Sequence, residues 1–257
     1  MGNIRFFLKF GKKEHMESLV EGNLYCSNAQ TFWGIEDNLK IRGQGDGLEA
    51  STVVHGQTMF VSAPKTNKVL TEINQAKCIA RIDPAKTIPV FCLFTVFEEE
   101  RETDDCGNIR ISLSQDTKNM IKEHFPNADS VVIIDNPQKF IEDVKNSIGH
   151  VIKGDLVHYY YIDEGIQKEN GNIAMDLRYI MYLTQDEQPL NVNGNEIYSL
   201  SEEFAYRVLF CKDVFFEEER EFRFVLPEDH ILMGTSYPVN LTEEYKIEEL
   251  EAFIREH

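Results

Sequence analysis

The sequence predicts a single α+β domain with a central, mostly antiparallel sheet flanked by helices. Segments with strand-like alternation and segments with helical spacing follow one another in no regular βαβ order, which disfavours a doubly wound sheet. The length of 257 residues lies at the upper end of what one hydrophobic core organises. We therefore expect residues 1–257 to form one domain.

The first strand and a short strand after the first helix carry polar candidates. Residues 4–10 have an apolar side chain at every second position, which indicates a strand with one buried face and with Lys9 on the other face. The short strand 24–27 carries Tyr25 and Ser27. These three side chains are candidates for lining a polar cleft.

Two stretches are expected to be loops. Residues 31–51 lose their periodicity and contain four glycines, which predicts a long glycine-containing loop holding the only tryptophan, Trp33. Residues 98–108 begin with an acidic run, which predicts a solvated acidic loop or hairpin. An aromatic plane such as Trp33 can stack on a base or sugar, but more commonly it is a hydrophobic plug that holds a loop in place.

The remaining elements follow from periodicity and turn residues. Helices are expected over 12–21, 115–124, 137–148 and 243–256, and strands over 78–82, 88–97, 131–134 and 155–163.

The strand expected over residues 216–226 carries the strongest chemical signal. Alternation places Glu219, Glu221 and Arg223 on one face, opposite an apolar face of Phe222, Phe224 and Leu226. Two carboxylates on one face raise each other's pKa unless a cation lies between them, and such pairs occur at catalytic sites. Glu219 and Glu221 are therefore the candidate catalytic residues. The alternative is an ion-pair network on an exposed sheet face.

Composition restricts the classes of partner. The formal net charge of −18 disfavours general binding to nucleic acid or to an anionic membrane. The five cysteines are scattered without a C-x-x-C pair, and the seven histidines show no ligand spacing, so neither a disulfide framework nor a metal site is expected. The charged first residues do not fit a signal peptide, which makes the cytoplasm the expected location. Oligomeric state is left open.

Several motifs together resemble a widespread bacterial family classed as a domain of unknown function. These motifs are Leu8-Lys9-Phe10, Asn23-Leu24-Tyr25-Cys26-Ser27, Phe91-Cys92-Leu93-Phe94 and the ending Lys212…Phe216-x-x-Glu219-x-Glu221-Phe222-Arg223. The resemblance spans most of the chain, and the ending is its most specific piece. It implies a fold rather than a reaction. The chain lacks the Met-Trp-x-x-Tyr segment expected after the Cys-Phe strand.

The order of the polar positions also resembles, more weakly, that of ADP-ribosyltransferases. That resemblance implies an ADP-ribosyltransferase-like fold in which Lys9 holds an NAD cofactor and Tyr25 or Ser27 lines the nicotinamide site. It also implies that Glu219 or Glu221 stabilises a developing oxocarbenium ion. Arg223 and Trp33 complete the set of candidate cofactor-binding residues.

Three hypotheses follow. The first is a transferase or glycohydrolase that acts on NAD or a related small-molecule nucleotide, in a toxin, phage-defence or stress setting. The second is a non-catalytic nucleotide- or protein-binding module in which the charged strand is a structural ion-pair ladder. The third is an acidic decoy of nucleic acid. An enzyme requires Glu219, Glu221, Lys9 and Tyr25 to converge on one cleft, whereas a scaffold leaves them on separate surfaces.

Overall fold

The computed structural model describes residues 3–39, 45–103, 109–169 and 171–257. The chain divides into two compact units. Unit 1 comprises Met1–Gly47, Thr87–Val157 and Phe216–His257, and unit 2 comprises Leu48–Lys86 and His158–Phe215. The single-domain organisation of residues 1–257 stays a prediction.

Unit 1 is built on a six-stranded sheet in which every neighbouring pair is antiparallel. In spatial order its strands are β18 (Lys246–Glu249), β8 (Ser130–Ile134), β1 (Ile4–Gly11), β5 (Val90–Phe97), β16 (Glu221–Val225) and β9 (Lys153–Leu156). The mixed α and β content and the antiparallel sheet agree with the predicted class.

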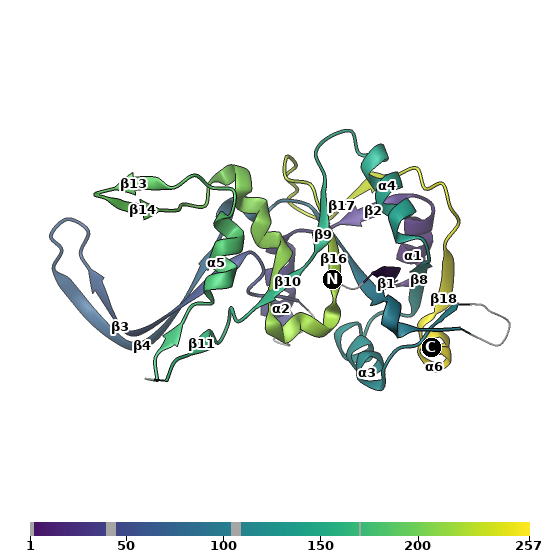
Figure 1. Cartoon of the computed structure of the whole chain (residues 1–257), viewed down its shortest axis with the longest axis horizontal. Helices are drawn as coiled ribbons and strands as arrows, with labels where there is room; N and C mark the ends of the chain where they lie inside the picture. The colour runs from purple at the N-terminus through teal and green to yellow at the C-terminus, as the bar shows by residue number, and fades with distance from the viewer. Residues whose placement is uncertain (1–2, 40–44, 104–108, 170) are drawn as a thin grey trace. The chain divides into compact units, whose positions relative to one another are not determined.

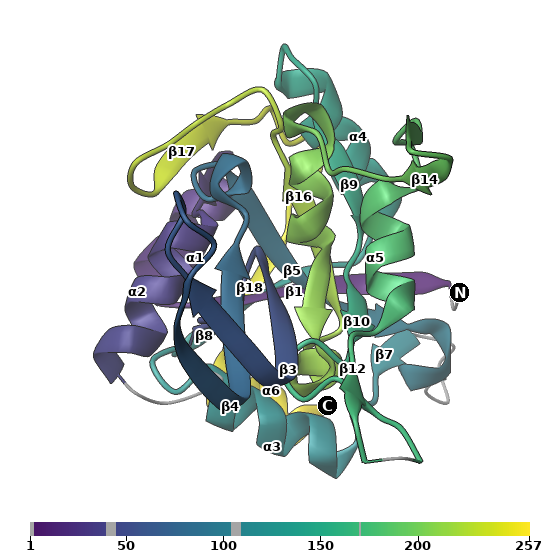
Figure 2. The ribbon, with the colours of Figure 1, turned by 90° about the vertical axis from the view of Figure 1, so that its left-hand side faces the viewer.

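Helices cover both faces of this sheet (Figure 1). On one side, the α1/α4 face, apolar side chains of β1 and β16 pack with α1 (Lys13–Val20), α4 (Pro137–Ser147) and β2 (Asn23–Cys26). On the other side, the α3/α6 face, the core includes side chains of α3 (Gln115–His124) and α6 (Leu250–Glu256), which lie together in Figure 2. β17 (Thr235–Pro238) pairs with β2. The expectation of helices flanking a central sheet is therefore confirmed for unit 1.

The position of β1 inside the sheet corrects the prediction that it has one buried face. Phe7 belongs to the core on the α1/α4 face, whereas Phe6 and Leu8 belong to the core on the α3/α6 face. Both faces are buried because β1 pairs with β5 on one edge and β8 on the other, and helices pack on each side. Three consecutive apolar residues are the sequence signal of such a doubly covered strand.

The long loop predicted for residues 31–51 was wrong in its first part. A helix, α2 (Ala29–Leu39), covers it, and residues 40–44 lie outside the described residues. The side chain of Asn28 accepts hydrogen bonds from the backbone N–H and the hydroxyl of Thr31, both at 2.8 Å, which satisfies a donor at the start of the helix. This cap stabilises the start of α2, and the helix continues through Gly34.

The acidic segment contains a hairpin, one of the two predicted alternatives. A short 3₁₀ turn, η2 (Glu98–Glu100), leads into β6 (Arg101–Thr103), which pairs with β7 (Ile109–Ile111). Residues 104–108 lie outside the described part of the chain.

Two other predicted elements have different limits in the structure. The strand expected over 155–163 is split into β9 and β10 (His158–Tyr160), which belong to different units. The final helix begins at Leu250 rather than 243, because residues 246–249 extend the sheet as β18. Pairing with β8 stabilises an extended conformation where helical spacing alone favoured a helix.

Unit 2 contains a long two-stranded ribbon, β3 (Ser51–Ser62) and β4 (Val69–Arg81). Its helix is α5 (Leu177–Thr184), and its 3₁₀ segments include η1 (Asp83–Ala85) and η3 (Glu202–Phe210). β10 pairs in parallel with β15 (Cys211–Asp213). Two short hairpins are formed by β11 (Ile166–Gln167) with β12 (Ile173–Ala174) and by β13 (Leu190–Val192) with β14 (Asn195–Ile197). Of the ribbon itself, the sequence predicted only the end of β4, over residues 78–82, whereas the strand predicted over 155–163 includes β10.

Among the described residues, no helix combines the length and the apolar character needed to cross a bilayer.

Candidate functional site

A buried pair of Glu219 and His124 lies on the α3/α6 face of unit 1. His124 is the last residue of α3, and its Nδ1 lies 2.8 Å from Oε1 of Glu219. The two side chains are 11% and 7% exposed. The imidazole also packs edge-on against the ring of Phe216, with centroids 6.4 Å apart. A carboxylate that holds an imidazole fixes the orientation of the ring, an arrangement used both in acid–base sites and in structural networks.

Glu221 and Arg223 form a second pair on the same face. Nε of Arg223 donates to Oε2 of Glu221 at 2.5 Å, and the guanidinium side chain is only 1% exposed. Glu221 lies opposite Phe94 in the register of β16 and β5, and Phe94 lies opposite Leu8 of β1. Directly opposite residues share a face, so this pair lies on the α3/α6 side. We call His124, Glu219, Glu221 and Arg223 the charge cluster.

The prediction that Glu219 lies on the strand with Glu221 and Arg223 was wrong. Glu219 ends the 3₁₀ segment η4 (Val214–Glu219), and β16 starts at Glu221. Between them Arg220 has a φ of 44°, in the left-handed region, and its carbonyl accepts from both N–H and Oγ1 of Thr95 at 3.0 and 2.5 Å. This turn breaks the alternation, and Arg220 then reaches an ion pair with Glu100. No residue preference predicts an arginine with positive φ.

Lys9 lies on the opposite side of the sheet from the charge cluster. It shares the α1/α4 face with Phe7, and its Nζ lies 4.8 Å from the ring centroid of Phe91 and donates to the carbonyl of Cys92 at 2.7 Å. On this side, burial raises the pKa of the Cys26 thiol to about 12, an effect that the nearby Lys9 ammonium partly opposes. The thiol therefore stays protonated at neutral pH and is not a nucleophile.

Of the other predicted cofactor residues, Arg223 belongs to the charge cluster, whereas Tyr25, Ser27 and Trp33 do not. Tyr25 is 61% exposed on β2, whose inward residues join the core on the α1/α4 face. Ser27 exchanges backbone hydrogen bonds with Val90, which extends the pairing beyond β2. Trp33 is 7% exposed on α2, which agrees with the role of a hydrophobic plug rather than an open stacking plane. The structure thus brings Glu221 and Arg223 together but leaves Lys9 and Tyr25 on the other side of the sheet.

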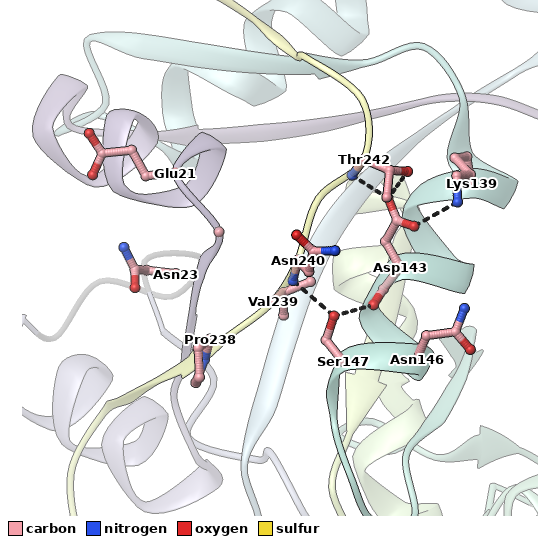
Figure 3. A pocket seen from close by; sticks show the side chains of 11 residues that line it. Glu21, Asn23, Lys139, Asp143, Asn146, Ser147, Pro238, Val239, Asn240 and Thr242 are labelled. Carbon is pink, nitrogen blue, oxygen red and sulfur yellow. Dashed lines mark hydrogen bonds and ion pairs between the residues drawn. The ribbon is translucent and has the colours of Figure 1, made fainter.

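A polar surface pocket of about 610 Å³ lies beside α4 in unit 1 (Figure 3). Residues 21–23, where the chain passes from α1 to β2, form one wall, and α4 with residues 238–242 forms the others. Asp143 accepts three hydrogen bonds at this pocket: its Oδ2 accepts from N and Oγ1 of Thr242 at 2.8 Å, and its Oδ1 accepts from Nζ of Lys139 at 2.8 Å. Asp143 therefore links α4 to the segment around Thr242 by hydrogen bonds and is not free to bind a ligand.

The electrostatics of Asp143 fit that structural role. Burial by itself raises the pKa of this carboxyl, but the hydrogen bonds from Lys139 and Thr242 outweigh it and lower the pKa below its usual value. The same pair raises the pKa of Lys139. The aspartate is thus ionised at neutral pH and is unsuited to act as a general acid.

Sequence reasoning missed both His124 and the Asp143 contacts. The sequence separation between His124 and Glu219 is 95 residues, so no local spacing could have linked them. Within the ranges that the structure describes, no group of three or more His, Cys, Asp or Glu side chains is arranged to hold a metal ion.

A search of protein-family models found no match to this chain, and searches of curated proteins and of solved structures found no significant match.

Proposed function

We propose that this protein is a non-catalytic module that binds a protein partner through the outer part of the β3–β4 ribbon, residues 58–74, which we call the distal ribbon. The observation that carries the proposal is the exposure of large apolar side chains there. Phe60 is 62% exposed and Leu70 63%, and the nearby Val61, Val69 and Ile73 are 43%, 52% and 46% exposed. Clustered exposed apolar side chains mark interaction sites far more often than scattered ones do.

The base of the ribbon is anchored in unit 2, and the distal ribbon extends beyond it (Figure 1). The hydroxyl of Tyr179 on α5 donates to the carbonyl of Ser51 at 2.8 Å, and His55 contacts the carbonyl of Asp163 at 2.8 Å. In the part of the chain that the structure describes, the side-chain hydrogen bonds of the distal ribbon stay within the β3–β4 ribbon and its turn, such as Thr58 to Asn74 at 3.0 Å and Cys78 to Met59 at 3.5 Å. An isolated two-stranded ribbon is only marginally stable in water, which favours a partner that covers it.

The charge cluster supports the non-catalytic character. Glu219 has His124 as its partner and Glu221 has Arg223, so both predicted catalytic carboxylates are engaged in buried pairs. Lys9, one of the predicted cofactor residues, lies on the other face of the sheet from them. This separation is the arrangement expected of a structural ion-pair network.

The test places a photoreactive benzoylphenylalanine at Phe60 in the full chain, expressed in cells. We expect protein adducts at Phe60 several times above those formed from the same group at Lys13, an exposed position on α1. Adduct levels at Phe60 no higher than at Lys13 would overturn the proposal.

The buried imidazole–carboxylate pair favours a second candidate function. In it, the chain is a nucleotide transferase or glycohydrolase with an ADP-ribosyltransferase-like unit 1, acting on NAD in a toxin or phage-defence setting. His124 oriented by Glu219 would move a proton, and Arg223 would offer positive charge to an anionic group. Release of nicotinamide from NAD by the purified chain tests it, with Glu219→Gln and His124→Gln as variants. Because we favour the binding module, we expect no release above buffer; release lost in a folded Glu219→Gln variant would instead identify an enzyme.

A further inference from the structure

We propose that the partner of the distal ribbon is the acidic surface of a second copy of this chain. This inference rests on the proposed function and specifies its occupant. It is carried by the opposite charges of the ribbon and of the rest of the chain, together with the apolar side chains that the ribbon exposes.

The ribbon is a basic segment in a strongly acidic protein. Between residues 51 and 81 the basic side chains are Lys65, Lys68, Lys77 and Arg81, and the acidic one is Glu72. Since the whole chain carries a formal charge of −18, the residues outside the ribbon carry an even larger negative charge. Complementary potentials steer association and fix the orientation of partners, so a second copy of this chain offers the negative charge that the ribbon attracts.

The basic charge of the ribbon also favours one arrangement of the two copies over another. Pairing two ribbons with each other would bring two net basic segments together, and such like-charge contacts are unfavourable. Placing each ribbon on the acidic surface of the other copy relieves this repulsion. A twofold arrangement then contains the contact twice and leaves neither ribbon unpaired.

The size of the ribbon is sufficient for this role. At about 3.4 Å per residue and about 4.8 Å between strands, one face of the distal ribbon covers about 300 Å². Two ribbons on two acceptor surfaces therefore bury about 1,200 Å², the lower end of the range for specific interfaces. Phe60 and Leu70 supply large apolar contacts, and the lysines supply a polar rim.

Analytical ultracentrifugation of the full-length purified chain at low salt tests the inference. We expect a dimer whose dissociation constant rises at least tenfold in Phe60→Ser/Leu70→Ser. The matched control is Leu232→Ser/Met233→Ser, which removes two exposed apolar side chains from unit 1 and should leave the dissociation constant within about threefold of wild type. Circular dichroism verifies that each variant is folded.

A charge variant tests the acidic acceptor separately. Lys65→Glu/Lys68→Glu should weaken the dimer at least tenfold, whereas Lys122→Glu/Lys145→Glu, which changes net charge equally on α3 and α4, should weaken it by less. Raising salt should also weaken the wild-type dimer. Equal effects of the two lysine pairs would overturn the acceptor assignment.

Failure of this inference is distinguishable from failure of the proposed function. The chain could be monomeric at every soluble concentration and still form adducts from Phe60 with a different protein. That result would overturn the second copy as the partner, but the proposal that the distal ribbon binds a protein would stand. A monomer without adducts overturns both.

Discussion

At the scale of single residues, the Glu219–His124 pair makes the first prediction. Replacing Glu219 with Ala removes the carboxylate that lies 2.8 Å from Nδ1 of the buried His124 imidazole. Loss of one member of a buried hydrogen-bonded pair costs about 1–3 kcal/mol. We expect the free energy of unfolding, measured by urea denaturation, to fall by about that amount.

The adjacent Glu218 gives a matched control, because it is exposed in the same 3₁₀ segment. Glu218→Ala should change the unfolding free energy by less than about 0.5 kcal/mol. If both alanine variants were equally stable, the pair would not be a structural one, and the case for the second candidate function would strengthen.

Asp143 gives a pH-dependent prediction. The hydrogen bonds from Lys139 and Thr242 lower its folded-state pKa, so this contribution to stability is complete above the unfolded-state pKa and is lost as pH falls through the folded one. Asp143→Asn should therefore lower the unfolding free energy at pH 7, and the difference from wild type should shrink as pH falls below about 4. Thermal unfolding measured between neutral pH and pH 3 checks this. A difference that stays constant over the range would contradict it.

The sequence predicted several residues of the candidate site, but it did not predict how their side chains are arranged in space. The sequence identified Glu221 and Arg223 as neighbours on one face, because strand alternation is local. It misplaced Glu219, because the left-handed turn at Arg220 depends on hydrogen bonds to Thr95, which is far away in the sequence. It also missed His124, which reaches the cluster only through the packing of α3 on the sheet.

At the scale of elements, Gly22 controls how α1 meets the C-terminal segment. Its φ is +92°, and a Cβ built there would lie 2.2 Å from the carbonyl oxygen of Val239. Gly22→Ala combines left-handed strain of about 1–2 kcal/mol with this clash against backbone, so we expect a loss above about 2 kcal/mol. The midpoint of thermal unfolding measures it.

Gly149 is the matched control, because a Cβ there meets nothing within 4 Å. Gly149→Ala should change stability by less than about 0.5 kcal/mol. Equal stability of the two alanine variants would show that the segment around Val239 moves away without cost.

The elements that the sequence predicted well are those that local signals define. The helix 115–124 has an N-cap at Ser114, and the helix after Asn136-Pro137 begins as expected, with the Asn136 side chain accepting from the N–H of Lys139. By contrast, β18 is a strand because β8 pairs with it, and the ribbon contains polar and apolar residues without clean alternation. In β18, pairing with a distant segment outweighed local preference, whereas the ribbon is paired with its own neighbour in the sequence, Ser62 lying opposite Val69.

At the scale of the whole molecule, charge acts on stability and on association in opposite directions. A formal charge of −18 makes the folded chain repel itself, whereas the basic ribbon attracts the acidic surface of another copy in the proposed dimer. Salt screens both interactions. Dilute and concentrated samples should therefore respond differently to ionic strength.

In dilute samples, where the chain is monomeric, raising ionic strength from about 0.01 to 0.1 M shortens the screening length from about 30 to 10 Å. Weaker self-repulsion should then raise the midpoint of thermal unfolding, by about 2–4 °C for each kcal/mol gained. Near pH 4.8, the isoelectric point calculated from the sequence, the net charge approaches zero and the same salt should have little effect. Scanning calorimetry at the two pH values measures this. An equal rise at both would mean that salt acts through hydration rather than charge, and the electrostatic argument for ribbon docking would then lose its support.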